Sequence, residues 1–199
     1  MPYELNSKIA KKLIGIKGEV RGVALKTDSD FIFRKAGKQA VLAVEEELKA
    51  LGVLLEYKKI SSLNFYPLGL RALSLLAAQK VMNLSDEGIK EMGTSAPKTS
   101  LILKLFMQYF LSIRRTFNEM PNIWGKHYTI GKLIPLSMDE ENKTASLRLE
   151  DFHLHPIFCQ YATGYFSKII EIVVKSPAKC KEVKCFFHGD KSHDFFMRW

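Results

Sequence analysis

The chain contains little cysteine, with three residues in 199. Three thiols are too few for a disulfide scaffold, and their odd number leaves at least one unpaired. Long apolar runs are also missing, because one of the longest covers only residues 72–78, far short of the ~18 that a membrane span requires. The N-terminus shows no secretory leader. We therefore expect a cytoplasmic protein without a membrane span, whose thiols are reduced and free to bind metal.

Catalytic and nucleotide-binding motifs are missing as well. The sequence contains no Gly-x-Ser-x-Gly nucleophile elbow, no P-loop and no Gly-x-Gly-x-x-Gly fingerprint. An acidic run at residues 139–141 is typical of a solvated hairpin loop rather than of a catalytic carboxylate pair. These absences predict a protein that is not an enzyme and that binds no nucleotide.

The composition that is present is that of a folded, basic domain. Hydrophobic residues make up 47% and aromatic residues 11%, enough for a core and for the walls of an apolar pocket. The formal net charge is +9, but the basic residues are scattered and no recognition-helix signature accompanies them. Binding to nucleic acid is therefore not expected. A basic nucleic-acid-associated regulator stays a weaker alternative, which salt-insensitive binding would count against.

Apolar periodicity divides the chain into a helical part and a part rich in strands. Helices are predicted over residues 7–17, 30–51, 67–83, 85–93 and 98–118. Residues 20–28 look extended, and Pro121 should prevent continuation of the last of these helices. Two hairpins, over 127–152 and 173–199, enclose a helix over 156–172. The fold class is therefore α+β, with N-terminal helices packed on a twisted antiparallel sheet of hairpin–helix–hairpin order.

Four potential metal ligands occur near the C-terminus: Cys159, Glu182, Cys185 and His193. Cys185 and His193 are separated by a Gly189-Asp190 turn, so a hairpin places them nearly opposite each other. Cys159 would approach from the preceding helix. Two thiolates, an imidazole and a carboxylate suit Zn²⁺ in a closed structural site.

Other interpretations of these residues stay open. A lone cysteine often only packs in the core, and His193 can simply hydrogen-bond in a turn. Cys180 could replace Cys159 as a ligand or be free. His153 and His155 would form a second metal corner with Cys159, but their position before Pro156 is more typical of a helix start.

The segment from residue 159 to residue 199 resembles the end of the 4-vinyl-reductase-like domain family, a group of small-molecule or hydrocarbon-binding domains. The family pattern is a Cys, then Gly-Tyr five residues on, then Glu-x-x-Cys, then a Gly and a further Cys. The matching residues here are Cys159, Gly164-Tyr165, Glu182, Cys185 and Gly189. The sequence departs from the pattern at the last position, where His193 replaces the Cys.

The resemblance implies a fold shared with TRAPP subunits and with haem-NO-binding-type sensors. It implies one domain over residues 1–199, in which 61–199 bind the ligand and 1–60 form an N-terminal extension or dimerisation part. It also implies a structural zinc at the four ligands. We expect no haem, because nothing resembles the Tyr-x-Ser-x-Arg clamp that holds haem propionates in NO sensors.

The function that the resemblance implies is non-catalytic binding of an aromatic, hydrocarbon or lipid-like molecule, with signalling through a protein partner and a homodimeric assembly. The aromatic side chains expected to line the pocket are Trp124, Tyr128, Phe152, Phe158, Tyr161 and Phe166. The alternative is an interaction or scaffold module of TRAPP-like fold, which would show an exposed apolar face and no internal cavity.

Overall fold

The computed structural model describes residues 3–99 and 112–199, so most of the helix predicted over 98–118 lies outside the described residues. The N-terminal elements are α1 (Ser7–Ile14), β1 (Glu19–Arg21), α2 (Gly22–Ala50), η1 (Tyr57–Lys59), β2 (Phe65–Pro67), α3 (Gly69–Met82) and α4 (Asp86–Thr99). The C-terminal elements are α6 (Ile113–His127), β3 (Lys132–Asp139), β4 (Thr144–Glu150), α7 (Pro156–Val174), β5 (Lys179–Lys184), η2 (Phe186–His188) and β6 (His193–Arg198). This confirms the α+β class and the hairpin–helix–hairpin order.

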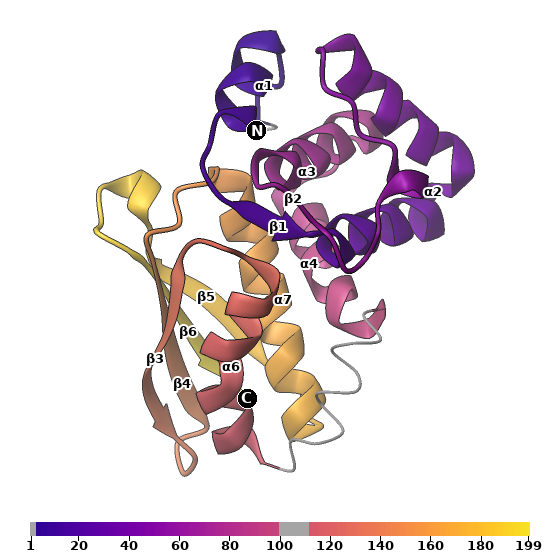
Figure 1. Ribbon diagram of the computed structural model, residues 1–199. Helices are drawn as coiled ribbons and strands as arrows, with labels where there is room; N and C mark the ends of the chain where they lie inside the picture. The colour runs from indigo at the N-terminus through magenta and orange to yellow at the C-terminus, as the bar shows by residue number, and fades with distance from the viewer. Residues whose placement is uncertain (1–2, 100–111) are drawn as a thin grey trace.

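The C-terminal strands form one antiparallel sheet in the order β3-β4-β6-β5. Alternate residues of β4, namely Ala145, Leu147 and Leu149, are buried, as expected for a sheet with one covered face. In the register Leu147 lies opposite Phe195, so apolar side chains of β4 and β6 share that face. α6 packs along β3, whereas α7 packs along β5 and β6 (Figure 1).

Helix α7 has clear start and stop signals in the sequence. His155 is its N-cap and accepts a hydrogen bond from the backbone N–H of Ile157, and Pro156 occupies the first turn. The helix ends at Lys175, which adopts a left-handed conformation with φ of 55°. Most of its side chains are buried because it lies between the sheet and the N-terminal helices (Figure 1).

Two glycines allow α4 and α7 to pack backbone against backbone. A Cβ atom on Gly93 would lie 2.0 Å from the carbonyl oxygen of Tyr161, and one on Gly164 would lie 2.0 Å from that of Lys90. Real side chains do not come so close, so both positions require glycine. The Gly164-Tyr165 motif therefore has a structural reason, namely the close approach of these two helices.

Several local predictions were wrong. The helix predicted over 85–93 continues to Thr99, and Ser112, the extended N-cap of α6, interrupts the helix predicted over 98–118. Residues 22–28 are helical rather than extended, because β1 ends at Arg21 and α2 begins at once. Pro121 lies inside α6, not after a helix. The burial of Phe117, Met120 and Trp124 on one face of α6 outweighs the hydrogen bond that the proline cannot donate. Among the described residues, no helix is both long and apolar enough to cross a membrane.

Candidate metal centre and ligand cavity

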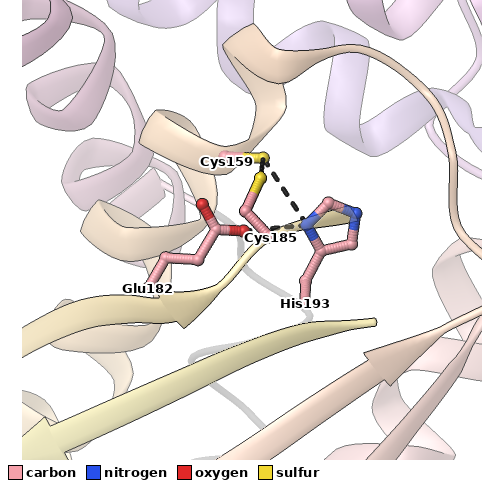
Figure 2. Close-up of side chains that lie close together, drawn as sticks. All are labelled: Cys159, Glu182, Cys185 and His193. Atoms are coloured by element: carbon pink, nitrogen blue, oxygen red, sulfur yellow. Dashed lines mark hydrogen bonds and ion pairs between the residues drawn. The ribbon is translucent and has the colours of Figure 1, made fainter. Parts of the chain in front are cut away.

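The four predicted metal ligands come together from three parts of the fold (Figure 2). Cys159 lies in the first turns of α7, Glu182 on β5, Cys185 directly after β5, and His193 at the start of β6. Glu182 lies opposite Phe195 in the register, which puts it diagonally across from His193 on the face that α7 covers. Their ligand atoms all lie within 4.8 Å of one another.

The individual contacts in this cluster converge on one point. The Sγ atom of Cys159 lies 3.8 Å from that of Cys185 and 3.7 Å from Nδ1 of His193. The same Nδ1 lies 2.8 Å from Oε1 of Glu182. Cys159, Cys185 and His193 are buried, and Glu182 is partly exposed. A site for one ion needs this convergence of sulfur, nitrogen and oxygen atoms from different elements.

The orientation of His193 suits a metal ligand. Its Nε2 lies 3.2 Å from the carbonyl oxygen of Phe152, which can only accept, so Nε2 carries a proton. In a neutral ring Nδ1 is then an acceptor that faces the Glu182 carboxylate, which is a second acceptor. Only a proton or a cation between them makes this contact favourable. A backbone carbonyl that fixes the outer nitrogen is also the usual arrangement for a histidine that binds metal.

Both thiols of the cluster are held in the protonated form when no cation is present. Burial raises the pKa of Cys159 well above its usual range, and the nearby Glu182 carboxylate raises it further. Burial also raises the pKa of Cys185. A bound cation would reverse this preference, because metals bind the thiolate.

A polar pocket of about 400 Å³ gives access to the cluster. Its walls include Cys159, Glu182 and Cys185, together with His188 and Asp190 from the turn. Asp190 also accepts a hydrogen bond of 2.8 Å from the backbone N–H of Cys185, which fixes the turn beside the ligands. An ion can therefore reach the site from solvent without any rearrangement of the core.

The alternative ligands are placed elsewhere. Cys180 is buried on β5 and is not a member of the cluster, although it lines the same polar pocket. His155 is the N-cap of α7, as its position before Pro156 indicated. His153 stacks on Phe186, with 3.6 Å between the ring centroids.

A second feature, an apolar cavity of about 70 Å³, lies on another side of α7. Five of the six aromatic side chains expected to line a pocket do line it: Trp124, Tyr128, Phe158, Tyr161 and Phe166. Phe152 is not in this lining and instead packs edge-on against Trp124, with 5.0 Å between the ring centroids. The remaining walls come from α2, α4, α6 and β3.

Sequence reasoning missed several residues of the cavity wall, including Thr27, His127 and Tyr165. The Nδ1 atom of His127 donates to the carbonyl oxygen of Ile123 at 2.8 Å, which leaves Nε2 as the free acceptor. Burial lowers the pKa of His127, so the ring is neutral. The signal in the sequence was its position at the end of a helix beside Trp124 and Tyr128.

Comparison with known proteins gives a fold but no sequence family. No family model matches the sequence. No curated protein matches it either. The structure, in contrast, is similar to an H-NOX protein from S. oneidensis in the Fe(II)NO ligation state, with a TM-score of 0.66 and 11% identity over 89% of this chain and 98% of that chain. This chain has the H-NOX fold.

Two further solved structures support the same conclusion. An oxygen-binding H-NOX domain related to soluble guanylate cyclases, in its oxygen complex, has a TM-score of 0.64 and 13% identity over 89% of this chain and 94% of that chain. A structure described as modulating haem redox potential through protein-induced porphyrin distortion has a TM-score of 0.64 and 14% identity over 90% and 99%. The expected NO-signalling ligand-binding fold is confirmed, whereas membership of the 4-vinyl-reductase-like family is not shown.

The cofactor prediction has to be corrected. We expected no haem because the sequence has no recognisable Tyr-x-Ser-x-Arg clamp, but proteins with this H-NOX fold include ones described with Fe(II)NO and with haem. A missing sequence motif is a weak ground for exclusion when identity is this low, because the same fold can hold a group with different side chains. The choice of zinc is likewise not supported, since the descriptions of these similar structures name iron or haem and not zinc.

Proposed function

We propose that this chain is a non-catalytic small-molecule sensor domain whose ligand occupies the apolar cavity beside α7. The observation that carries this proposal is the cavity itself, walled mainly by aromatic and aliphatic side chains. Among the described residues, no Asp, Glu, Cys, Ser or Lys lines it. The scaffold alternative expected no internal cavity, and the cavity therefore favours the sensor.

The ligand would signal by changing how the helices pack. α7 contributes the largest share of the cavity wall and also packs against α4 through Gly93 and Gly164. A molecule that binds one packing of these helices better than another shifts the population between them. A protein partner that contacts the helical surface would detect that shift.

Xenon is a sharp probe of this proposal because it binds dry apolar cavities. We expect ¹²⁹Xe NMR to show saturable binding to the wild-type protein, and we expect Ala162→Leu, which fills the cavity from α7, to abolish it. Gly125→Ala is the matched control, because nothing lies within 4 Å of that position and the cavity is unchanged. Equal xenon binding by wild type and Ala162→Leu would contradict the proposal.

A second candidate ligand is haem, favoured by His127 and by the similar structures. The apolar wall and a neutral imidazole with its Nδ1 fixed by a carbonyl fit an iron porphyrin in chemistry. The cavity of about 70 Å³ would have to open, because cofactor pockets enclose about 300–1,000 Å³. His127 would hold the iron through Nε2, and the haem would supply a metal that binds diatomic gases. A Soret band on haem addition that His127→Ala abolishes and His153→Ala retains would support this candidate.

We further propose that Cys159, Glu182, Cys185 and His193 hold a structural divalent metal ion. The facing acceptors of His193 and Glu182, 2.8 Å apart, carry this proposal. Co²⁺ is the probe, because its thiolate complexes absorb visibly. We expect a one-to-one titration with a tetrahedral spectrum, unchanged in Cys180→Ala and altered in Cys185→Ala. An imidazolium–carboxylate ion pair in place of a metal would give no such spectrum.

A further inference from the structure

A fully buried arginine lies behind the wall of the apolar cavity. Arg71 of α3 is 0% exposed, and its Nη1 donates to Oδ2 of Asp28 and, at 3.3 Å, to the carbonyl oxygen of Ala24. Ser74 donates to the same Asp28 oxygen at 2.7 Å. The Asp28 carboxylate thus compensates the charge of Arg71, and both groups are fixed by several contacts.

This arrangement leaves part of the guanidinium incompletely paired. Among the described residues, none makes a hydrogen bond of normal geometry with Nε or Nη2 of Arg71 or with Oδ1 of Asp28. The Tyr128 phenol nevertheless interacts with the Arg71 side chain, which lowers the pKa of that phenol. Unpaired N–H groups in the interior are costly, and native proteins keep few of them. The Arg71 guanidinium therefore keeps N–H groups available to a nearby acceptor.

The Arg71 guanidinium lies next to the wall of the cavity. The guanidinium carbon of Arg71 lies 4.3 Å from the ring centroid of Tyr161, which lines the cavity. Ala24, whose carbonyl oxygen binds Arg71, also lines it. Arg71 is therefore next to the cavity at two places, on α2 and on α7, although its own side chain is not part of the lining.

Three tyrosines are among the residues that line the cavity. Tyr128, Tyr161 and Tyr165 all line the cavity, and the rings of Tyr161 and Tyr165 stack with 6.3 Å between their centroids. Burial raises the pKa of each phenol, so all three stay protonated and can donate hydrogen bonds, while Arg71 acts on each in the opposite direction. The cavity thus combines apolar walls with phenolic donors that a buried cation polarises.

We propose that the cavity ligand is a small neutral molecule with an apolar body and one hydrogen-bond-accepting oxygen, such as a ketone or an aldehyde, bound by the phenols of Tyr128, Tyr161 and Tyr165. Arg71 is a positioning residue that polarises these donors. A carboxylate fits less well, because Asp28 already compensates Arg71 and a second buried anion would be uncompensated. This inference rests on the proposed ligand cavity and specifies what it binds.

A matched set of three ligands tests it on the full chain. Cyclopentanone carries the oxygen, methylenecyclopentane is its isostere without an acceptor, and cyclopentanecarboxylate is the anion. We expect cyclopentanone to bind at least about tenfold more tightly than the other two, the worth of roughly one net hydrogen bond. The infrared carbonyl band of bound ¹³C-labelled cyclopentanone should shift to lower wavenumber than in hexane, because a donor weakens the bond.

Variants assign the donor. Tyr161→Phe and Tyr128→Phe should each reduce the preference for ketone over alkene and leave alkene binding unchanged. Tyr57→Phe is the matched control, because this buried phenol bonds to Ser74 at 2.8 Å and does not line the cavity. The double variant Asp28→Leu, Arg71→Met removes the buried pair as a unit and should weaken the carbonyl shift. The infrared spectrum of cyclopentanone bound to the wild-type protein tests the proposal even if a variant fails to fold.

The outcomes separate this inference from the proposed function. Equal binding of ketone and alkene, with a carbonyl band as in hexane, would overturn the polar anchor and leave the ligand cavity standing. Preference for the carboxylate would overturn the assignment of a neutral ligand. If neither xenon nor any of the three ligands binds, the cavity and the anchor both fail.

Discussion

The two sides of α7 present opposite kinds of interior. Cys159 belongs to a cluster of four polar side chains, whereas Tyr161 and Phe166 line an apolar cavity. The cluster is small and converges on a single point within 4.8 Å, but the cavity is walled by side chains from five elements. The difference fits the two proposals, a structural metal ion on one side of the helix and a ligand on the other.

The largest effect should come from the helix that both regions share. Gly164→Ala would place a Cβ atom 2.0 Å from the carbonyl oxygen of Lys90, and we expect the free energy of unfolding to fall by about 3 kcal/mol or more. Gly125→Ala, on exposed helix with open space, should instead raise it by about 0.5–1 kcal/mol. Urea unfolding measures both. Equal effects at the two positions would show that the α4–α7 contact does not limit stability.

The next largest effect should come from a substitution that disrupts only the metal cluster. Cys185→Ala removes one of the proposed metal ligands. Loss of a residue that only hydrogen-bonds to a ligand typically lowers metal affinity by about 10–100-fold, and we expect Co²⁺ affinity to fall by more than that. Xenon binding in the cavity should be unchanged, because the cavity lining does not include Cys185. Cys180→Ala, which removes a buried thiol outside the cluster, should retain Co²⁺ affinity. Loss of xenon binding in Cys185→Ala would show that the two regions are coupled.

The pH dependence of metal binding sharpens the same comparison. Because the pKa values of Cys159 and Cys185 are raised, both thiols are protonated at neutral pH, and metal binding has to release their protons. Affinity should therefore rise with pH through the neutral range, by up to about 100-fold per unit when two protons leave. Calorimetry in buffers of different ionisation enthalpy counts the protons. Cys185→Ala should release one fewer, and an affinity independent of pH would contradict the thiolate site.

The smallest effect should come from a substitution that fills only the cavity. Ala162→Leu should lower cyclopentanone affinity by about tenfold or more, because the added side chain occupies space that the ligand needs. Co²⁺ affinity should not change, since Ala162 is not in the metal cluster. Parallel ligand and Co²⁺ titrations of one sample measure both. Unchanged cyclopentanone binding would place that ligand outside the cavity.

The strand-rich half of the molecule could be predicted because its signals are local. Buried residues alternate along β4, Gly189 permits the turn with φ of 100°, and His155 with Pro156 begins α7. The start of α2 could not be predicted this way. Gly22 approaches the carbonyl oxygen of Ser61 so closely that a Cβ atom would lie 2.1 Å from it, and only that tertiary contact distinguishes it from a flexible residue.

The candidate sites show the same limit. The cluster of four side chains was predictable in part, because Glu182 and His193 lie on the two paired strands of one hairpin and Cys185 follows directly after the first of them. Arg71 carried a weaker signal, a cation near the start of a helix whose residues 69–79 are all buried, whereas the other cation of this helix, Lys80, lies at its exposed end. The sequence could not indicate that its partner is Asp28, 43 residues away.

The sequence by itself determined the hairpin–helix–hairpin unit, the polar residues available to the cluster and the apolar character of α7, because spacing and periodicity are properties of neighbouring residues. Tertiary structure decided the rest. It alone placed α2 and α6 beside α7 to form the cavity, brought Arg71 behind Tyr161, and revealed the H-NOX fold that overturned the exclusion of haem. These features depend on contacts between distant segments, and 11–14% identity is enough to conserve the packing without any readable motif.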